Sequence, residues 1–208
     1  MDILVFPILI ISLFLGGCSA QIEPVLTRRP LVEPLPVSVG VYFSPEFRGY
    51  RSHCDAWLCP EYDVGPPNVA LFELLFAGLF KDVVILDATP TVHSNLKVDG
   101  IFVPEISYLK ADAPPAQITY RFTLRYASAE ASGALEVESV WEVEGSAWSG
   151  ASFVSELVRL AMRDAAAKFV KGFRGEPVVR SWLKQVGIES LEMDPKAPLS
   201  QIYEGAQP

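Results

Sequence analysis

Two segments in the middle of the chain alternate apolar and polar residues, the period of a β-strand with one buried face. They span 117–126 and 135–143, and the short connection between them predicts an antiparallel hairpin. Opposed residues of a hairpin have a constant sum of sequence positions, and only an odd sum places the aliphatic residues of both strands on one face. The same parity sets Arg121 and Arg125 opposite the glutamates of the second strand. Hydrophobic and charge patterns therefore select the same class of register.

Shorter periodic segments predict further strands before the hairpin. A proline inside the last of them, Pro104, indicates an edge position or a bulge, because proline cannot donate to a sheet ladder. These strands are expected over 37–43, 83–86 and 101–108.

Apolar residues at helical spacing predict two long helices. The first begins at Asn68, read as its N-cap, and runs to about Phe80; the second spans 153 to about 173 after Ser152. The first helix is so apolar that it must be covered, either by the sheet or by another protein. The expected fold class is α+β, with a mainly antiparallel sheet of four to five strands packed by two long helices.

Prolines at both ends of the chain mark the borders of the expected domain. Four prolines between 18 and 36 predict an extended tether, and the proline-bearing end of the chain predicts a flexible tail. The predicted organisation is a signal peptide at 1–17, the tether at 18–36, a single α+β domain at 37–187 and the tail at 188–208.

The opening stretch is uncharged from 3 to 15 and ends in Leu15, Gly16, Gly17 and Cys18. As a helix it would measure about 20 Å, short of the roughly 30 Å hydrocarbon core of a bilayer. The ending resembles the lipobox of a bacterial lipoprotein, which implies cleavage before Cys18 and a fatty-acyl anchor such as palmitate on that cysteine. The stretch departs from the export pattern at its start, since Met1 and Asp2 bring no positive charge.

Charge and cysteine content narrow the expected partners. The chain carries 25 acidic and 17 basic residues, a balance that disfavours nucleic acid and anionic lipid surfaces as ligands. Membrane contact is therefore expected from the lipid rather than from charge. In an exported protein Cys54 and Cys59 favour a disulfide; the alternatives are a metal site that adds His53, or two reduced thiols.

The region from 44 to 67 is rich in proline and glycine and predicts a long loop. Its aromatic residues Tyr50, Trp57 and Tyr62 are candidates for a partner surface. The alternative is that Trp57 and its neighbours fold back over the core.

The sequence lacks the motifs of common catalytic sites. It contains no glycine-rich phosphate loop, no paired cysteine motif with zinc spacing and no serine nucleophile elbow. His53 and His93 have no adjacent nucleophile signature. We therefore expect neither an enzyme nor a bound cofactor or metal.

The order of elements behind a lipobox resembles the small α+β lipoproteins of the bacterial envelope, including auxiliary lipoproteins of ABC-type transport and lipopolysaccharide-assembly systems. The resemblance rests on the lipobox, on 35–45 (LPVSVGVYFSP), and on 118–124 followed by 140–145 (VWEVEG). It implies a lipid-anchored accessory or adaptor subunit of an envelope protein complex. Ser19 after the cysteine favours the outer membrane, facing the periplasm, with the inner membrane or the cell surface as alternatives. A second hypothesis is a carrier that holds a lipid or other apolar ligand between its helices and its sheet.

Overall fold

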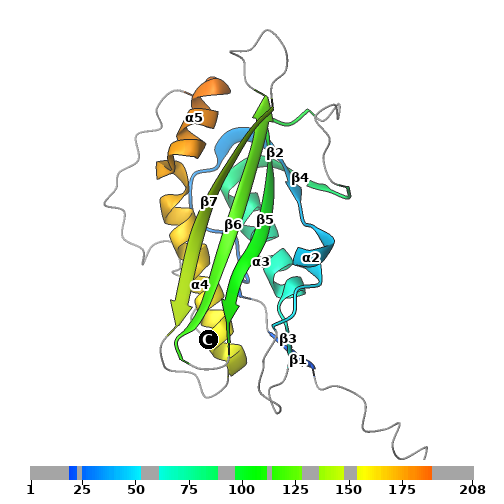
Figure 1. Ribbon diagram of the computed structural model, residues 1–208. Helices are drawn as coiled ribbons and strands as arrows, with labels where there is room; N and C mark the ends of the chain where they lie inside the picture. Colours follow the sequence, from blue (N-terminus) through cyan, green and yellow to red (C-terminus); the bar gives the residue numbers. More distant parts are fainter. Residues whose placement is uncertain are drawn as a thin grey trace, which may run out of the picture.

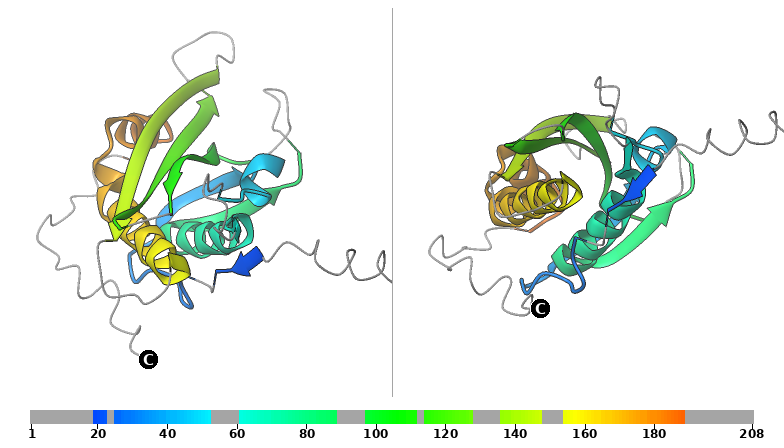
Figure 2. Two further views of the ribbon diagram at one scale, coloured as in Figure 1. Left: turned by 60° about the horizontal axis from the view of Figure 1, so that its bottom comes forward. Right: turned by 90° about the horizontal axis from the view of Figure 1, so that it is seen from below.

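A five-stranded mixed sheet is the centre of the computed structural model, with the long helices on its concave side (Figures 1 and 2). In sheet order its strands are β4 (Phe80–Leu86), β2 (Leu35–Tyr42), β5 (Gly100–Lys110), β6 (Ala116–Ala127) and β7 (Glu136–Ala147). The helices are α2 (Pro45–Arg48), α3 (Gly65–Leu79), α4 (Val154–Gly172) and α5 (Pro177–Gln185), with a 3-10 turn, η1 (Phe173–Gly175), before α5. The structure describes residues 19–22, 25–52, 61–88, 97–111, 114–127, 136–147 and 154–188.

The α+β class is confirmed, but the sheet is not mainly antiparallel. Strand β2 pairs in parallel with both β4 and β5, and only β5, β6 and β7 form an antiparallel meander. The difference arises because β2, α3 and β4 form a crossover unit, and a helical crossover returns the chain parallel to its first strand. Strand β4 begins at Phe80, directly after the last residue of α3, so the predicted strand at 83–86 missed its first half.

The predicted hairpin and its register are confirmed. Every opposed pair of positions in β6 and β7 has the same odd sum, with Arg121 opposite Glu142 and Arg125 opposite Glu138. Both pairs form ion pairs, at 3.0 Å between Arg121 Nη2 and Glu142 Oε1 and at 3.1 Å between Arg125 Nε and Glu138 Oε2. On β5, Pro104 lies beyond the stretch that pairs with β2, so among the described residues only β6 pairs with β5 there.

Helix α3 begins four residues before the predicted start, since its N-cap is Val64 and not Asn68. Pro66 and Pro67 lie in its first turn, where the missing N–H groups have no helical partner in any case. Asn68 is therefore not the N-cap but a buried residue inside the helix. The region from 44 to 67 also contains α2 and a short strand, β3 (Glu61–Asp63), so it is not one long loop.

Aromatic rings fill the space between the sheet and the helices. Phe122 of β6 lies 4.4 Å from Phe169 of α4 and 5.4 Å from Phe72 of α3, measured between ring centroids. Trp182 of α5 is fully buried, and its indole N–H donates to the carbonyl oxygen of Asp99 at 2.8 Å. The core therefore connects both long helices and α5 to the sheet.

Helix α4 lies unusually close to the edge strand β7. A Cβ atom on Gly145 would come within 2.1 Å of the carbonyl oxygen of Ala161 and 2.6 Å of Cβ of Ala165, so only glycine permits this approach. At that distance Asp164 accepts a hydrogen bond from the backbone N–H of Ser146 at 2.9 Å. The ammonium of Lys168 donates to the carbonyl oxygen of Glu144 at 3.1 Å and pairs with Asp164 at 2.9 Å. Side chains of α4 thus satisfy backbone groups at the outer edge of β7.

The segment predicted to be a free tether lies against the folded domain. Strand β1 (Ser19–Gln21) pairs in parallel with β3, and Ile22 and Val25 are buried in the core. Pro30 lies against Gly78 of α3, and Arg174 donates to the carbonyl oxygen of Glu33. Burial of the apolar residues among the prolines is more favourable than leaving them in water on an extended tether. The domain therefore begins near residue 19 rather than at 37. Residues 1–17 and the tail from 189 lie outside the described residues.

The hairpin predicts a contrast in stability between its two faces. Phe122 is fully buried, so Phe122→Ala should lower the free energy of unfolding by roughly 3 to 5 kcal/mol. Arg121→Ala on the exposed face should cost less than about 1 kcal/mol, because an exposed ion pair contributes little. Urea denaturation of protein that begins at Ser19 measures both, and equally small effects would contradict the half-buried hairpin.

Candidate docking surface

The cysteines to which we assigned roles lie outside the described residues. Cys18, the predicted lipid site, directly precedes β1, while Cys54, Cys59 and Trp57 fall in the segment 53–60. Their acylation and their disulfide therefore stay predictions.

The two ends of the segment 53–60 are held together by hydrogen bonds. The N–H of Ser52 donates to the carbonyl oxygen of Tyr62, and the N–H of Tyr62 donates to Oγ of Ser52, both at 2.9 Å. Arg51 pairs with Asp63 in an isolated bridge, and its guanidinium lies 3.9 Å from the carboxylate of Glu61.

Two of the three aromatic residues predicted for a partner surface face the protein itself. Tyr62 is 9% exposed and belongs to the core, and Tyr50 is half-buried against it. Burial raises the pKa of both hydroxyls above the ordinary value of 10.0. The alternative interpretation, folding back over the core, therefore holds for Tyr50 and Tyr62. Burial of their rings removes apolar surface from water.

A buried polar pair links α3 to the sheet. The hydroxyl of Tyr120 donates to Oδ1 of Asn68, whose amide in turn donates to the carbonyl oxygen of Val64 at 2.8 Å. Both side chains are almost fully buried, and burial raises the pKa of Tyr120 well above 10.0. The tyrosine thus stays a neutral donor at physiological pH. The pair stabilises the packing of α3 on the sheet and does not act as an acid or base.

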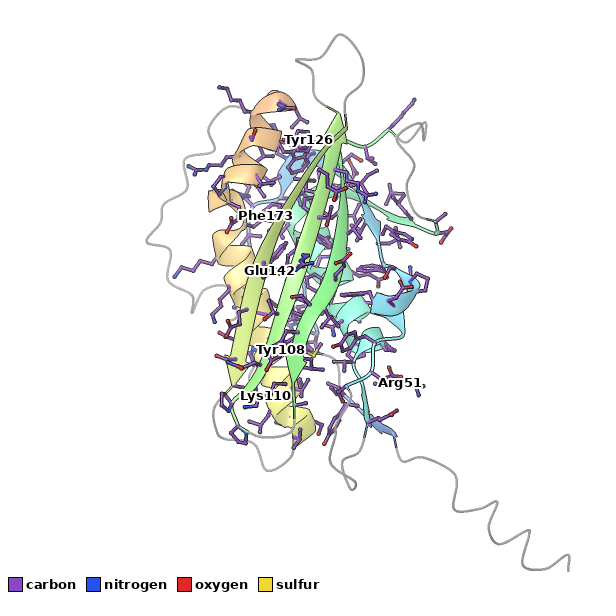
Figure 3. The ribbon with its side chains drawn as sticks, viewed as in Figure 1. Arg51, Tyr108, Lys110, Tyr126, Glu142 and Phe173 are labelled. Carbon is purple, nitrogen blue, oxygen red and sulfur yellow. The ribbon has the colours of Figure 1, made fainter. Side chains whose placement is uncertain are left out.

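The outer face of the sheet, turned away from the helices, is charged over β6 and β7. Figure 3 shows Glu142 on this face, with Tyr108 and Lys110 farther along β5. The ion pairs of Arg121 and Arg125 with the β7 glutamates lie here, and their side chains are partly exposed to solvent. This half of the face is a solvated surface whose ion pairs adjust the register more than the stability.

At the edge of the sheet opposite β7, strand β4 carries exposed apolar residues. In the described part of the chain no segment pairs with the outer edge of β4. Val84 is 43% exposed and Ile85 is 37% exposed, and Lys81 and Asp87 flank them in water. We call Lys81, Val84, Ile85 and Asp87 the β4 edge. Exposed backbone groups beside exposed apolar side chains are typical of a site where another chain adds a strand.

The pairing register places the two apolar residues of the β4 edge on opposite faces. Val83 and Ile85 pair with the buried Val39 and Val41 and so point to the helix side. Val84 pairs with Gly40 and points to the outer face. The edge therefore offers apolar contacts above and below one line of backbone groups.

Sequence reasoning found β4 as a strand but missed it as a candidate surface. The run of Val83, Val84, Ile85 and Leu86 is equally compatible with a buried strand, and only the order of strands in the sheet makes it an edge. The available signal was the pair of charges, Lys81 and Asp87, that borders the run.

Two other kinds of site are absent from the described residues. Within these ranges no group of three or more histidine, cysteine, aspartate or glutamate side chains is placed to hold a metal ion. No helix in the described part of the chain has both the length and the apolar character needed to cross a membrane.

Comparisons with known proteins give likenesses of fold only. No family model matches the sequence, and no curated protein matches it. A Xanthomonas campestris protein of the DUF330 family is similar in structure, with a TM-score of 0.45 and 10% identity over 74% of this chain and 92% of that one. A hypothetical protein from Chlamydia trachomatis has a TM-score of 0.30 and 15% identity over 72% and 94% of the two chains.

The buried hydrogen bond between Tyr120 and Asn68 predicts how the stability of the protein responds to mutation and to pH. Tyr120→Phe leaves Oδ1 of Asn68 buried without its donor and should lower the free energy of unfolding by about 1 to 3 kcal/mol. The raised pKa of Tyr120 means that stability is unaffected below pH 10 and falls above it, by up to about 1.4 kcal/mol per pH unit, as the unfolded state loses its proton first. Tyr120→Phe should lack this part of the alkaline decline.

Denaturant titrations between pH 8 and 11 measure both effects. Tyr108→Phe is the matched control, because Tyr108 is 49% exposed and its loss should change the free energy of unfolding by no more than about 0.5 kcal/mol. Equal alkaline slopes for wild type and Tyr120→Phe would argue against a buried neutral Tyr120.

Proposed function

We propose that this protein is a lipid-anchored, non-enzymatic accessory subunit of a transport or assembly complex in the bacterial envelope. The lipobox that ends at Cys18 supports the location, and Ser19 after it favours the outer membrane with the domain in the periplasm. The observation that carries the mode of action is the β4 edge, an open strand with exposed apolar residues.

The anchor and the domain are close together in this proposal. Strand β1 starts at Ser19, and Ile22 and Val25 are already buried in the core. A lipid on Cys18 would therefore hold the domain at the membrane surface with little slack. A domain restrained in this way meets a membrane-bound partner at high effective concentration.

The packing of the core favours an accessory protein over a carrier. A carrier needs room for an apolar ligand between helices and sheet, and here Phe76 of α3 lies 5.3 Å from Phe102 of β5 and 6.0 Å from Phe169 of α4. Rings at these centroid separations are in contact. The apolar face of α3 is thus used by the protein's own core.

Acylation and binding partners test the proposal together. Native mass spectrometry of the full-length protein, extracted from bacterial membranes, should show a chain that begins at Cys18, carries acyl groups and retains a polypeptide partner. Cys18→Ser should lose the acyl groups and the membrane fractionation. Cys59→Ser is the matched control and should keep both, because Cys59 lies outside the lipobox.

Two results would contradict the proposal. One is a wild-type chain that still contains residues 1–17 and has no acyl groups. The other is a mature chain that retains an apolar small molecule and no polypeptide, which would favour the carrier.

A further inference from the structure

The two edge strands of the sheet differ in whether their outer backbone groups are covered. The backbone of β7 is covered at its edge by Asp164 and Lys168 of α4, whereas β4 has no such cover in the described part of the chain. Natural sheets usually protect an open edge with charges, a bulge or a covering segment. An uncovered edge with Val84 and Ile85 exposed is therefore a surface that another strand is expected to fill.

The sequence of β4 is complementary to itself in one antiparallel register. In a two-fold contact centred on Val84, Lys81 of one copy lies opposite Asp87 of the other, and Val83 lies opposite Ile85. The two-fold axis repeats the pair of Lys81 with Asp87, so the contact contains two such pairs. The exposed apolar residues of the two copies then cover one another.

Neighbouring registers of the same contact are less favourable. Centring on Asp82 places this carboxylate opposite its own copy, and centring on Ile85 places Val83 opposite Asp87. The register centred on Val84 leaves one mismatch, Asp82 opposite Leu86. Asp82 is exposed, so its carboxylate keeps water there.

We propose that the occupant of the β4 edge is a second copy of this chain, which joins two five-stranded sheets into one continuous sheet through antiparallel β4 strands. Backbone hydrogen bonds supply the contact, and the pairs of Lys81 with Asp87 select the register. The inference deepens the proposed function, because it names the partner at the β4 edge of an anchored accessory protein. The resulting dimer carries two anchors.

Cysteine cross-linking in membranes tests the geometry. In the proposed register Val84 lies next to Val84 of the second copy, with Cβ atoms about 5 Å apart. Full-length Val84→Cys should therefore form a covalent dimer under mild oxidation, above the background of the wild-type cysteines. Tyr108→Cys is the matched control, since Tyr108 has similar exposure, 49% against 43%, but lies away from the edge. Equal cross-linking of the two variants would overturn the proposal.

Charge exchange tests the register in the detergent-extracted full chain. Lys81→Glu or Asp87→Lys alone should raise the dissociation constant of the dimer roughly tenfold, since two attractive pairs become repulsive. The double variant, Lys81→Glu with Asp87→Lys, should restore it. A wild-type monomer, or a double variant no tighter than the single ones, would overturn the proposal.

The outcomes separate this inference from the proposed function. A Val84→Cys adduct with a different polypeptide would overturn the second copy and leave the accessory role intact. A wild-type chain that carries no acyl group on Cys18 would overturn the proposed function, but it would not affect the dimer in detergent.

Discussion

The close contact of α4 with β7 at Gly145 decides which edge of the sheet remains open. Because Gly145 has no side chain, the helix backbone lies directly on the strand, and Asp164 and Lys168 reach the backbone groups of β7. The same contact brings Phe169 onto Phe122 and so closes the aromatic core. On the opposite side, α3 runs directly into β4 and lies on the concave face, where it cannot cover the edge of that strand.

The open edge and the N-terminal segment together constrain how the protein can work. Strand β1 pairs with β3, and Ile22 and Val25 are buried in the core, so a lipid on Cys18 would hold the domain near the bilayer in a restricted set of orientations. The acidic chain gains little from anionic lipids, so in the proposed function the lipid on Cys18 and the protein contacts would determine where the protein resides. The charged half of the outer face suits solvent, and the β4 edge suits another strand.

The sequence pattern correctly predicted those elements whose neighbours in the fold are also close in the sequence. The β6–β7 register followed from the two-residue period and from the positions of Arg121 and Arg125, because cross-strand neighbours are set by the hairpin itself. The parallel pairing of β2 was missed because it joins segments far apart in the chain. Asn68 resembled a helix cap because prolines precede it, whereas its role depends on Tyr120, which lies far along the sequence. The tether was misread for a similar reason: its composition is proline-rich, but its few apolar residues find partners only in the folded domain.

Hydrogen–deuterium exchange along the two sheet edges tests the central claim most directly. At a concentration between the dissociation constants of the two proteins, the outward amides of β4 should exchange more slowly in the full-length wild type than in Lys81→Glu. The amide of Ser146 should be slow in both, because Asp164 holds it within each copy. Fast exchange of the β4 amides in the wild type, at the same rate as in Lys81→Glu, would contradict an edge that is filled by a second copy.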